Sequence, residues 1–238
     1  MEQWRRYLEQ FAEREGDVEA QTVIGSYHAA EVFGFLSLSL DRDQRFRTLI
    51  SERLEYFREG TRRASVFDET LITACFTLYN HMNTLCHQFA HGNVSAEDLI
   101  HGVDEQVHVR VRQANPVERS AAALRAAFPL LSLMTLFLRE GPQAAAAIRK
   151  VEARFAAGSA RAGTDWEHLL NALYRLVEMM QLFVTLSDVE LKDQVQQIAA
   201  RFEEEDQTTD LKLKLRNGFC RLFELGHLLT THLDEIIP

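Results

Sequence analysis

This chain of 238 residues is poor in proline, glycine and cysteine, with 4, 11 and 3 of each. Proline and glycine break helices, so their scarcity leaves room for long, uninterrupted helices. The three cysteines (Cys75, Cys86 and Cys220) are odd in number and form no C-x-x-C pair. They therefore predict reduced thiols in a cytoplasmic protein rather than a disulfide framework.

Basic charge and long apolar runs are also in short supply. Asp and Glu outnumber Lys and Arg by 35 to 26, which gives a net charge of −9. Phosphate neutralisation needs clustered cations, so this balance argues against a nucleic-acid partner.

The uninterrupted apolar run 126–138 is shorter than the roughly 20 residues that cross a bilayer. Residues 1–15 lack the apolar segment of a secretion signal, and we expect no membrane partner.

The common catalytic motifs are missing as well. The sequence has no Gly-rich phosphate loop, no G-x-S-x-G and no H-E-x-x-H. Each of these motifs places a nucleophile, a phosphate cradle or metal ligands at a fixed spacing. Without them, we expect no cofactor.

The chain does contain a succession of helical patterns, in which apolar residues recur every three or four positions. Gly16, Gly60 and Gly92 are typical of helix ends, and Asp17 and Asp41 are suitable caps for the helices that follow. The expected helices cover 2–15, 17–40, 41–60, 67–91, 95–113, 116–140 and 142–157, followed by helices that begin at 164 and 187 and a last one at 210–236.

Four of these helices begin with a capping box, in which a side-chain acceptor is followed three residues later by an acid. The boxes are Ser95–Asp98, Asn115–Glu118, Thr164–Glu167 and Ser187–Glu190. The segment 107–111 alternates valine with other residues, as a strand would. Val103, Val107 and Val111 are four residues apart, which favours a helix.

The helix expected at 116–140 is the most apolar in the chain. Glu118, Arg125, Ser132 and Arg139 recur every seven residues and form a narrow polar stripe, and nearly all other positions are apolar. A helix of this kind must be covered on several sides. We therefore expect the other helices to pack around it, with Leu131 and Phe137 buried, and we expect Pro129 to kink or divide it.

Short connections between these elements make neighbouring helices antiparallel. The predicted fold is all-α, a multi-helix bundle of roughly nine antiparallel helices, with a helical solenoid as the second choice. We expect a single domain over residues 1–238. The stretch AAGSARAG at 156–163 resembles a flexible linker and is the one place where the composition permits a boundary.

Two Glu-x-x-His pairs, Glu105/His108 and Glu224/His227, are the strongest metal-site pattern. Ferritin-like carboxylate proteins combine two such pairs with two further glutamates in a bundle core, a role that Glu31 and Glu178 could fill. The apolar face of the last helix, however, lies away from Glu224 and His227, so we expect both to face solvent.

His87 and His91 have the i, i+4 spacing that suits one metal ion. They fall on a polar face without a third ligand, and we expect no metal there.

Arg221 and His227 are separated as in the Arg-x(4–6)-His pattern, and this pair resembles the motif of HEPN-type helical ribonucleases. In that family the Arg and the His act together on the RNA phosphodiester, so the resemblance implies a ribonuclease. It covers only these two residues.

Two further features have simple structural explanations. His28 lies near the apolar face of its helix and is expected to be a hydrogen-bonded core histidine, and the acidic run 203–206 is expected to be a solvated helix end.

The sequence thus favours a non-enzymatic protein–protein interaction or regulatory protein, which binds another protein or itself. The alternatives are a HEPN-like ribonuclease and a carboxylate/histidine metal-binding bundle.

Overall fold

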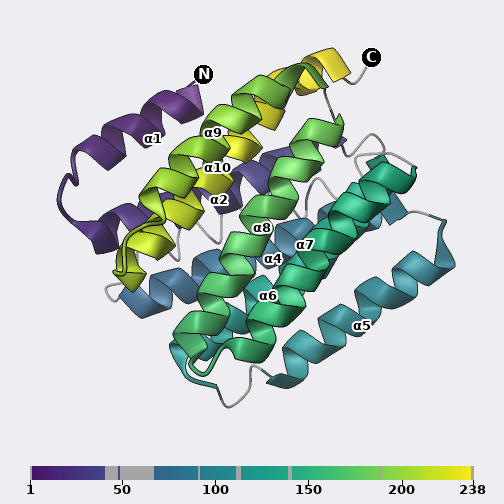
Figure 1. Ribbon diagram of the computed structural model, residues 1–238, viewed down its shortest axis with the longest axis horizontal. Helices are drawn as coiled ribbons and strands as arrows, with labels where there is room; N and C mark the ends of the chain where they lie inside the picture. The colour runs from purple at the N-terminus through teal and green to yellow at the C-terminus, as the bar shows by residue number, and fades with distance from the viewer. Residues whose placement is uncertain are drawn as a thin grey trace.

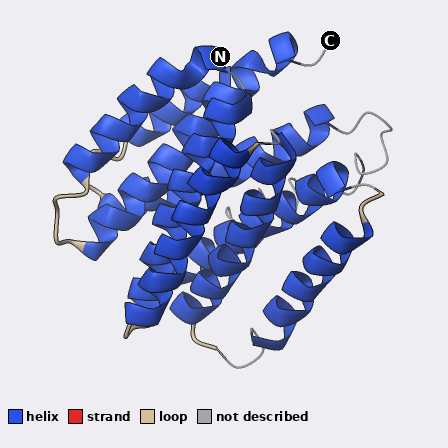
Figure 2. Ribbon diagram, turned by 45° about the vertical axis from the view of Figure 1, so that its right-hand side comes forward, coloured by secondary structure: helices blue, strands red, loops and turns tan. Residues whose placement is uncertain are grey.

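A computed structural model describes residues 2–40, 48, 67–90, 92–110, 114–138, 141–187 and 189–236. Every regular element within these ranges is a helix, so the all-α prediction is confirmed (Figure 2). The expected helix at 41–60 lies outside the described residues. The helices are α1 (Glu2–Ala12), α2 (Val18–Leu40), α4 (Phe67–Ala90), α5 (Val94–Arg110), α6 (Pro116–Leu138), α7 (Pro142–Arg161), α8 (Asp165–Ser187), the short 3-10 helix η2 (Val189–Leu191), α9 (Lys192–Glu205) and α10 (Leu211–Ile236).

Most helix ends agree with the residues that predicted them. Gly16 and Gly92 have positive φ angles of 84° and 82°, which a glycine adopts without steric cost. The carboxylate of Asp17 accepts a hydrogen bond from the Ala20 amide at 3.0 Å. The side chain of Asn115 accepts one from the Glu118 amide at 2.9 Å. These side chains satisfy amides that have no partner inside the first turn.

Two of the four predicted capping boxes are wrong. α5 begins before Ser95, because the side chain of Asn93 caps it by accepting from the Ala96 amide at 3.2 Å. Ser187 ends α8 instead of starting the next helix, and its hydroxyl donates to the Phe183 carbonyl at 2.7 Å. A serine can bond back to its own helix as well as cap the next one, and the sequence pattern does not distinguish the two.

The predicted linker at 156–163 is also wrong, because α7 continues through this stretch to Arg161. Alanine favours a helix more than any other residue, and the small residues allow a close approach to α8. The side chain of Asn171 on α8 donates to the Phe155 carbonyl and the Ser159 hydroxyl, both at 3.1 Å. A Cβ atom at Gly158 would lie 1.9 Å from Asn171 Oδ1. The single domain over 1–238 stays a prediction.

Five long helices form a closed ring in which each packs against the next: α2 on α4, α4 on α6, α6 on α8, α8 on α10, and α10 back on α2. The remaining helices lie outside this ring (Figure 1). α1 packs on α2, α5 on α4 and α6, α7 on α6 and α8, and α9 on α8 and α10. This arrangement confirms the multi-helix bundle.

α6 is one member of the ring rather than the helix around which all the others pack. Leu131 is fully buried as predicted, but Phe137 remains 36% exposed, so that prediction is wrong. The side of α6 on which Leu136 and Phe137 lie is therefore partly open to solvent. On another side of α6, the polar stripe faces α7, where the buried hydroxyl of Ser132 donates to Glu152 at 2.5 Å. Pro129 lies inside a continuous helix and does not divide it.

Two helices, α6 and α8, are long and apolar enough to cross a membrane by length and composition. Half or more of the most apolar part of each is buried inside the bundle. The core helix of a soluble protein meets the same criteria, so these two helices are weak support for a membrane span.

Candidate functional site

The two Glu-x-x-His pairs do not come together. Glu105 is exposed on α5, and Glu224 is buried on α10, on the far side of the bundle (Figure 1). The side chain of His108 lies outside the described part of the chain. Among the described residues, no three His, Cys, Asp or Glu side chains lie close enough to hold a metal ion.

The two glutamates proposed as further ligands have other neighbours. Glu31 is fully buried, and its carboxylate lies 3.5 Å from His28 Nδ1. Glu178 lies between two guanidinium groups, 2.9 Å from Arg154 and in direct contact with Arg175. The structure therefore gives these two carboxylates separate sets of neighbours and does not bring them into a shared site.

His87 pairs with a residue that its sequence spacing did not indicate. Its ring lies 5.8 Å from that of His101 on α5, and His91 lies outside the described residues. The side chain is partly buried between α4 and α5. Burial, followed by the neighbouring His101, lowers the pKa of His87, and the neutral imidazole is the favoured form at neutral pH.

Glu224 belongs to a buried ionic group, which corrects the expectation that it faces solvent. Its carboxylate contacts the guanidinium of Arg221, whose side chain is only 7% exposed, and lies 3.1 Å from Arg201 on α9. Arg221 also binds Glu205 on α9 at 2.6 Å. The polar face of α10 is therefore the face that α9 covers.

The acidic run 203–206 is correspondingly more than a solvated helix end. Glu205 binds Arg221, and Asp206 accepts a hydrogen bond from the Tyr174 hydroxyl at 2.6 Å. Burial lowers the pKa of Arg221, but Glu224 and Glu205 raise it by more, so this guanidinium stays charged.

The side chains of Arg221 and His227 contact different neighbours. Arg221 is bound by two carboxylates, whereas the His227 ring stacks on Phe223, with centroids 5.8 Å apart. His227 is partly buried, and burial lowers its pKa. A ribonuclease site would need both groups around one phosphate, and the described geometry does not bring them to a common open position.

Next to this ionic group, Tyr7 of α1 fills a buried space between α2 and α10. Its ring lies 4.4 Å from Phe223 and 5.5 Å from His28. Burial raises the pKa of the Tyr7 hydroxyl, and it raises the pKa of the adjacent Cys220 thiol to about 11. His28 is a hydrogen-bonded core histidine as predicted, with Nε2 2.9 Å from the side-chain oxygen of Gln10.

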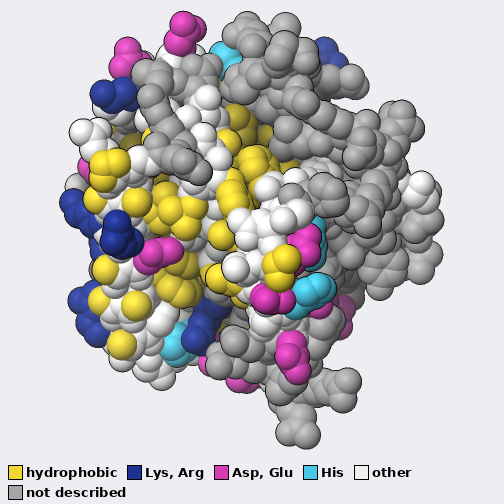
Figure 3. Space-filling view, turned by 90° about the vertical axis from the view of Figure 1, so that its right-hand side faces the viewer, with side chains coloured by type: hydrophobic (Ala, Val, Ile, Leu, Met, Phe, Trp, Pro, Cys, Tyr) yellow, Lys and Arg dark blue, Asp and Glu magenta, His cyan; other side chains and the backbone are white. Residues whose placement is uncertain are grey.

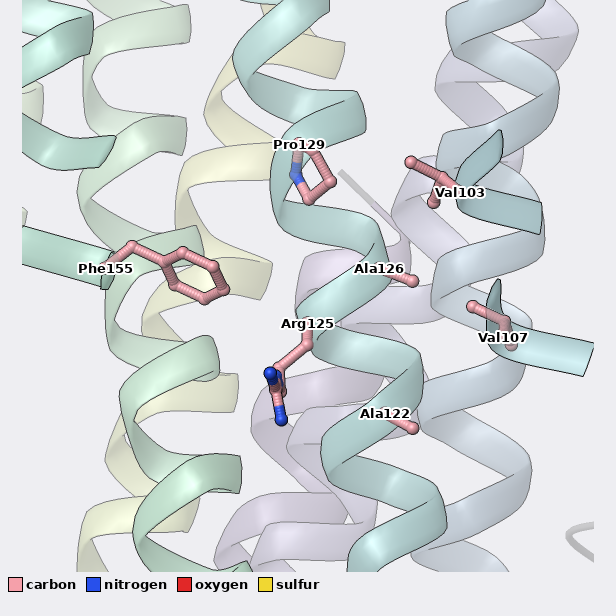
Figure 4. A pocket seen from close by; sticks show the side chains of 7 residues that line it. All are labelled: Val103, Val107, Ala122, Arg125, Ala126, Pro129 and Phe155. Carbon is pink, nitrogen blue, oxygen red and sulfur yellow. The ribbon is translucent and has the colours of Figure 1, made fainter. Parts of the chain in front are cut away.

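An apolar groove lies on the opposite side of the bundle, over α6 and between α5 and α7. Its volume is about 210 Å³. Figure 4 shows Phe155 of α7 on one side of α6 and two valines of α5 on the other. The groove is lined by Val103, Val107, Ala122, Arg125, Ala126, Pro129 and Phe155.

The same face of α6 continues beyond the groove as an uncovered apolar surface. Leu133 is partly exposed, and Leu136 and Phe137 are 41% and 36% exposed. These positions lie on one side of a helix of 3.6 residues per turn, together with Ala122, Ala126 and Pro129. We call this set of six residues the α6 strip. Figure 3 shows hydrophobic side chains gathered across the middle of one face of the molecule.

The sequence contains a signal for the α6 strip. Apolar residues follow one another at 122, 126, 129, 133 and 137, and this spacing marks a helix face. Because most of the helix circumference is apolar, the sequence predicts only that the helix is covered on several sides. Only the tertiary structure distinguishes a face that another helix covers from one that remains open.

The fold and the groove together define the molecule as an all-helical bundle with an open apolar groove on one face. Comparison of the chain with protein-family models, with curated proteins and with solved structures gives no match in any of the three.

Proposed function

We propose that this protein is a binding module whose α6 strip receives an amphipathic helix of a partner protein. The observation that carries the proposal is the strip itself: a continuous apolar face that follows the groove between α5 and α7. Exposed apolar surfaces of this kind mark interaction sites.

The shape of the strip favours a helix as the bound element. From Ala122 to Phe137 it covers fifteen steps of a helix, or about 22 Å at 1.5 Å per residue. α5 and α7 form walls on the two sides of its first half, from Ala122 to Pro129. An amphipathic helix placed in such a groove presents apolar residues at i, i+3, i+4 and i+7 to the floor.

The charge on α5 indicates the chemistry of the partner. All charged residues of α5 whose side chains are described are acidic, and Asp98 and Glu105 are exposed. Opposite charges across an interface guide association and disfavour wrong partners. The partner helix should therefore carry Lys or Arg along the flank that lies over α5.

We also propose that the protein acts in the cytoplasm. Its three cysteines are free and buried, which suits a reducing compartment. Burial raises the pKa of Cys75 and of Cys86 to about 12. These thiols remain protonated at neutral pH and behave as core residues.

A display library of amphipathic helices, selected on the purified protein, tests the binding module directly. The best peptide is then titrated by fluorescence anisotropy against the wild type and against Ala122→Glu and Leu136→Glu. A buried charge facing an apolar helix should weaken binding at least about tenfold in both variants. Leu211→Glu is the matched control, because Leu211 is 42% exposed but lies at the start of α10, and it should bind like the wild type.

Two outcomes would contradict the proposal. One is a selected peptide that binds Ala122→Glu and Leu136→Glu as well as it binds the wild type, with circular dichroism showing all variants folded. The other is binding of phosphatidylcholine or phosphatidylglycerol vesicles that is lost in the same two variants while no peptide is enriched. That result would assign the α6 strip to a membrane surface.

The ribonuclease alternative has its own assay, incubation of the protein with mixed-sequence single-stranded RNA. We expect no cleavage, because Arg221 and His227 do not share an open position, and we expect His227→Ala to keep its peptide binding. Cleavage by the wild type that disappears in His227→Ala would favour the enzyme instead.

A further inference from the structure

A second groove runs along the other side of α7, over α8 and between α7 and α9. Figure 1 shows α8 between these two helices. The groove has a volume of about 640 Å³. Its apolar lining includes Val151, Leu182, Val195, Ala199 and Phe202.

One wall of this groove has an excess of positive charge. Arg154 and Arg175 share a single carboxylate, that of Glu178. Lys150, one turn from Arg154 on α7, is exposed and forms no ion pair with the described part of the chain. Three cations thus face one acid on the α7 side.

The opposite wall, formed by α9, is acidic. Glu203 lines the groove, is exposed and has no ion-pair partner among the described residues. Asp206 also lines it, and lies 3.3 Å from Lys214 of α10. The groove therefore has a basic wall and an acidic wall.

Arg154 of the basic wall and Glu203 of the acidic wall lie at nearly the same level along α8. Arg154 contacts Glu178, and Asp206 contacts Tyr174, one helical turn away. Phe202, the neighbour of Glu203, has its ring 4.8 Å from that of Tyr174. Arg154 and Glu203 consequently face each other across the groove within about one 5.4 Å turn.

We propose that this face binds a second copy of the chain and forms a two-fold symmetric dimer. A two-fold axis parallel to α8 and in the plane of the interface exchanges left and right but keeps the level along the axis. It therefore brings the basic α7 wall of each copy opposite the acidic α9 wall of its partner, twice in one interface. Most homodimers are isologous, with one surface that is complementary to itself, and this charge pattern satisfies that condition.

The test is a charge-swap experiment by sedimentation equilibrium and light scattering. The wild type should form a dimer that weakens as the salt concentration rises. Lys150→Glu gives the α7 wall an acid that faces the partner's acidic wall, and Glu203→Lys does the reverse. Each variant alone should dimerise at least about tenfold more weakly, because like charges then meet twice.

Mixing the two variants is the decisive measurement. In the mixed dimer, the α7 wall that carries Lys150→Glu lies opposite the α9 wall that carries Glu203→Lys, and the second pair of walls is unchanged, so dimerisation should return. Arg149→Glu and Glu204→Lys are matched controls, because both residues are exposed neighbours outside the groove, and they should dimerise like the wild type.

Three results would overturn the dimer: a wild type that is monomeric at every concentration, a mixture that stays monomeric, or control variants that weaken dimerisation as much as the groove variants. The dimer does not depend on the α6 strip, which lies on the other side of α7. Peptide binding with a monomeric wild type would leave the proposed function intact and reject only the dimer.

Discussion

The guanidinium of Arg221 on α10 donates a hydrogen bond of 2.6 Å to the carboxylate of Glu205, sixteen residues earlier on α9. The same guanidinium contacts Glu224, so one cation serves two acids at the boundary between the last two helices. Taking the buried charges of Arg221 and Glu224 out of water is costly, and the contact between them offsets that cost only while both are present.

Removing Arg221 should therefore destabilise the protein strongly. Arg221→Met leaves the buried Glu224 without its closest partner, and the expected loss in the free energy of unfolding is about 3–5 kcal/mol. Urea denaturation measures it. Arg201→Ala is the control, since the Arg201 side chain is 54% exposed and its loss should cost under about 1 kcal/mol. A small effect of Arg221→Met would show that the ionic group contributes little to folding.

Leu131 and Phe137 provide a second test, because both are large apolar residues of the same helix. Leu131 is fully buried, and Leu131→Ala should cost about 2–5 kcal/mol through lost apolar contact and a cavity. Phe137 is 36% exposed, and Phe137→Ala should cost clearly less. Equal shifts in the denaturation midpoint would mean that the open side of α6 is covered.

Two helical glycines should respond to alanine in opposite directions. A Cβ atom at Gly226 on α10 would lie 2.4 Å from Val32 Cγ1 on α2, so Gly226→Ala should push these helices apart at a cost of about 1–3 kcal/mol. A Cβ at Gly102 on α5 would meet nothing within 4 Å, and Gly102→Ala should stabilise the protein by about 0.5–1 kcal/mol. Thermal unfolding of both variants compares them, and a shift of the same sign would contradict the packing of α2 on α10.

Stability should fall as the pH is lowered from about 7 to 5. Burial lowers the pKa of His227 below its ordinary value of 6.5. As the pH falls below 6.5, the unfolded chain takes up this proton before the folded protein does, and the free energy of unfolding decreases. Denaturation at a series of pH values measures the slope, which should be smaller in His227→Gln. An unchanged slope in that variant would show that His227 titrates normally.

The sequence by itself determined the helical elements, because their causes are local. Apolar spacing selects helices, and residues such as Asp17, Asn115 and Gly92 end or cap them through contacts within a few positions of the chain. The burial of Leu131 also followed from its helix alone. Ser187 can either cap the helix that follows or bond back to its own helix, and the sequence pattern does not distinguish these two roles.

Only the tertiary structure decided which helix faces are covered. Glu224 lies on the less apolar side of α10, and it is buried because α9 packs there and supplies Arg201. Phe137 lies on a largely apolar helix, and yet it is 36% exposed. A helical wheel gives the polarity of each face but not the neighbour that meets it. Which helix packs against a given face depends on how segments distant in the sequence pack. At Glu224 and Phe137 this packing, and not the polarity of the face, decided whether the side chain is buried.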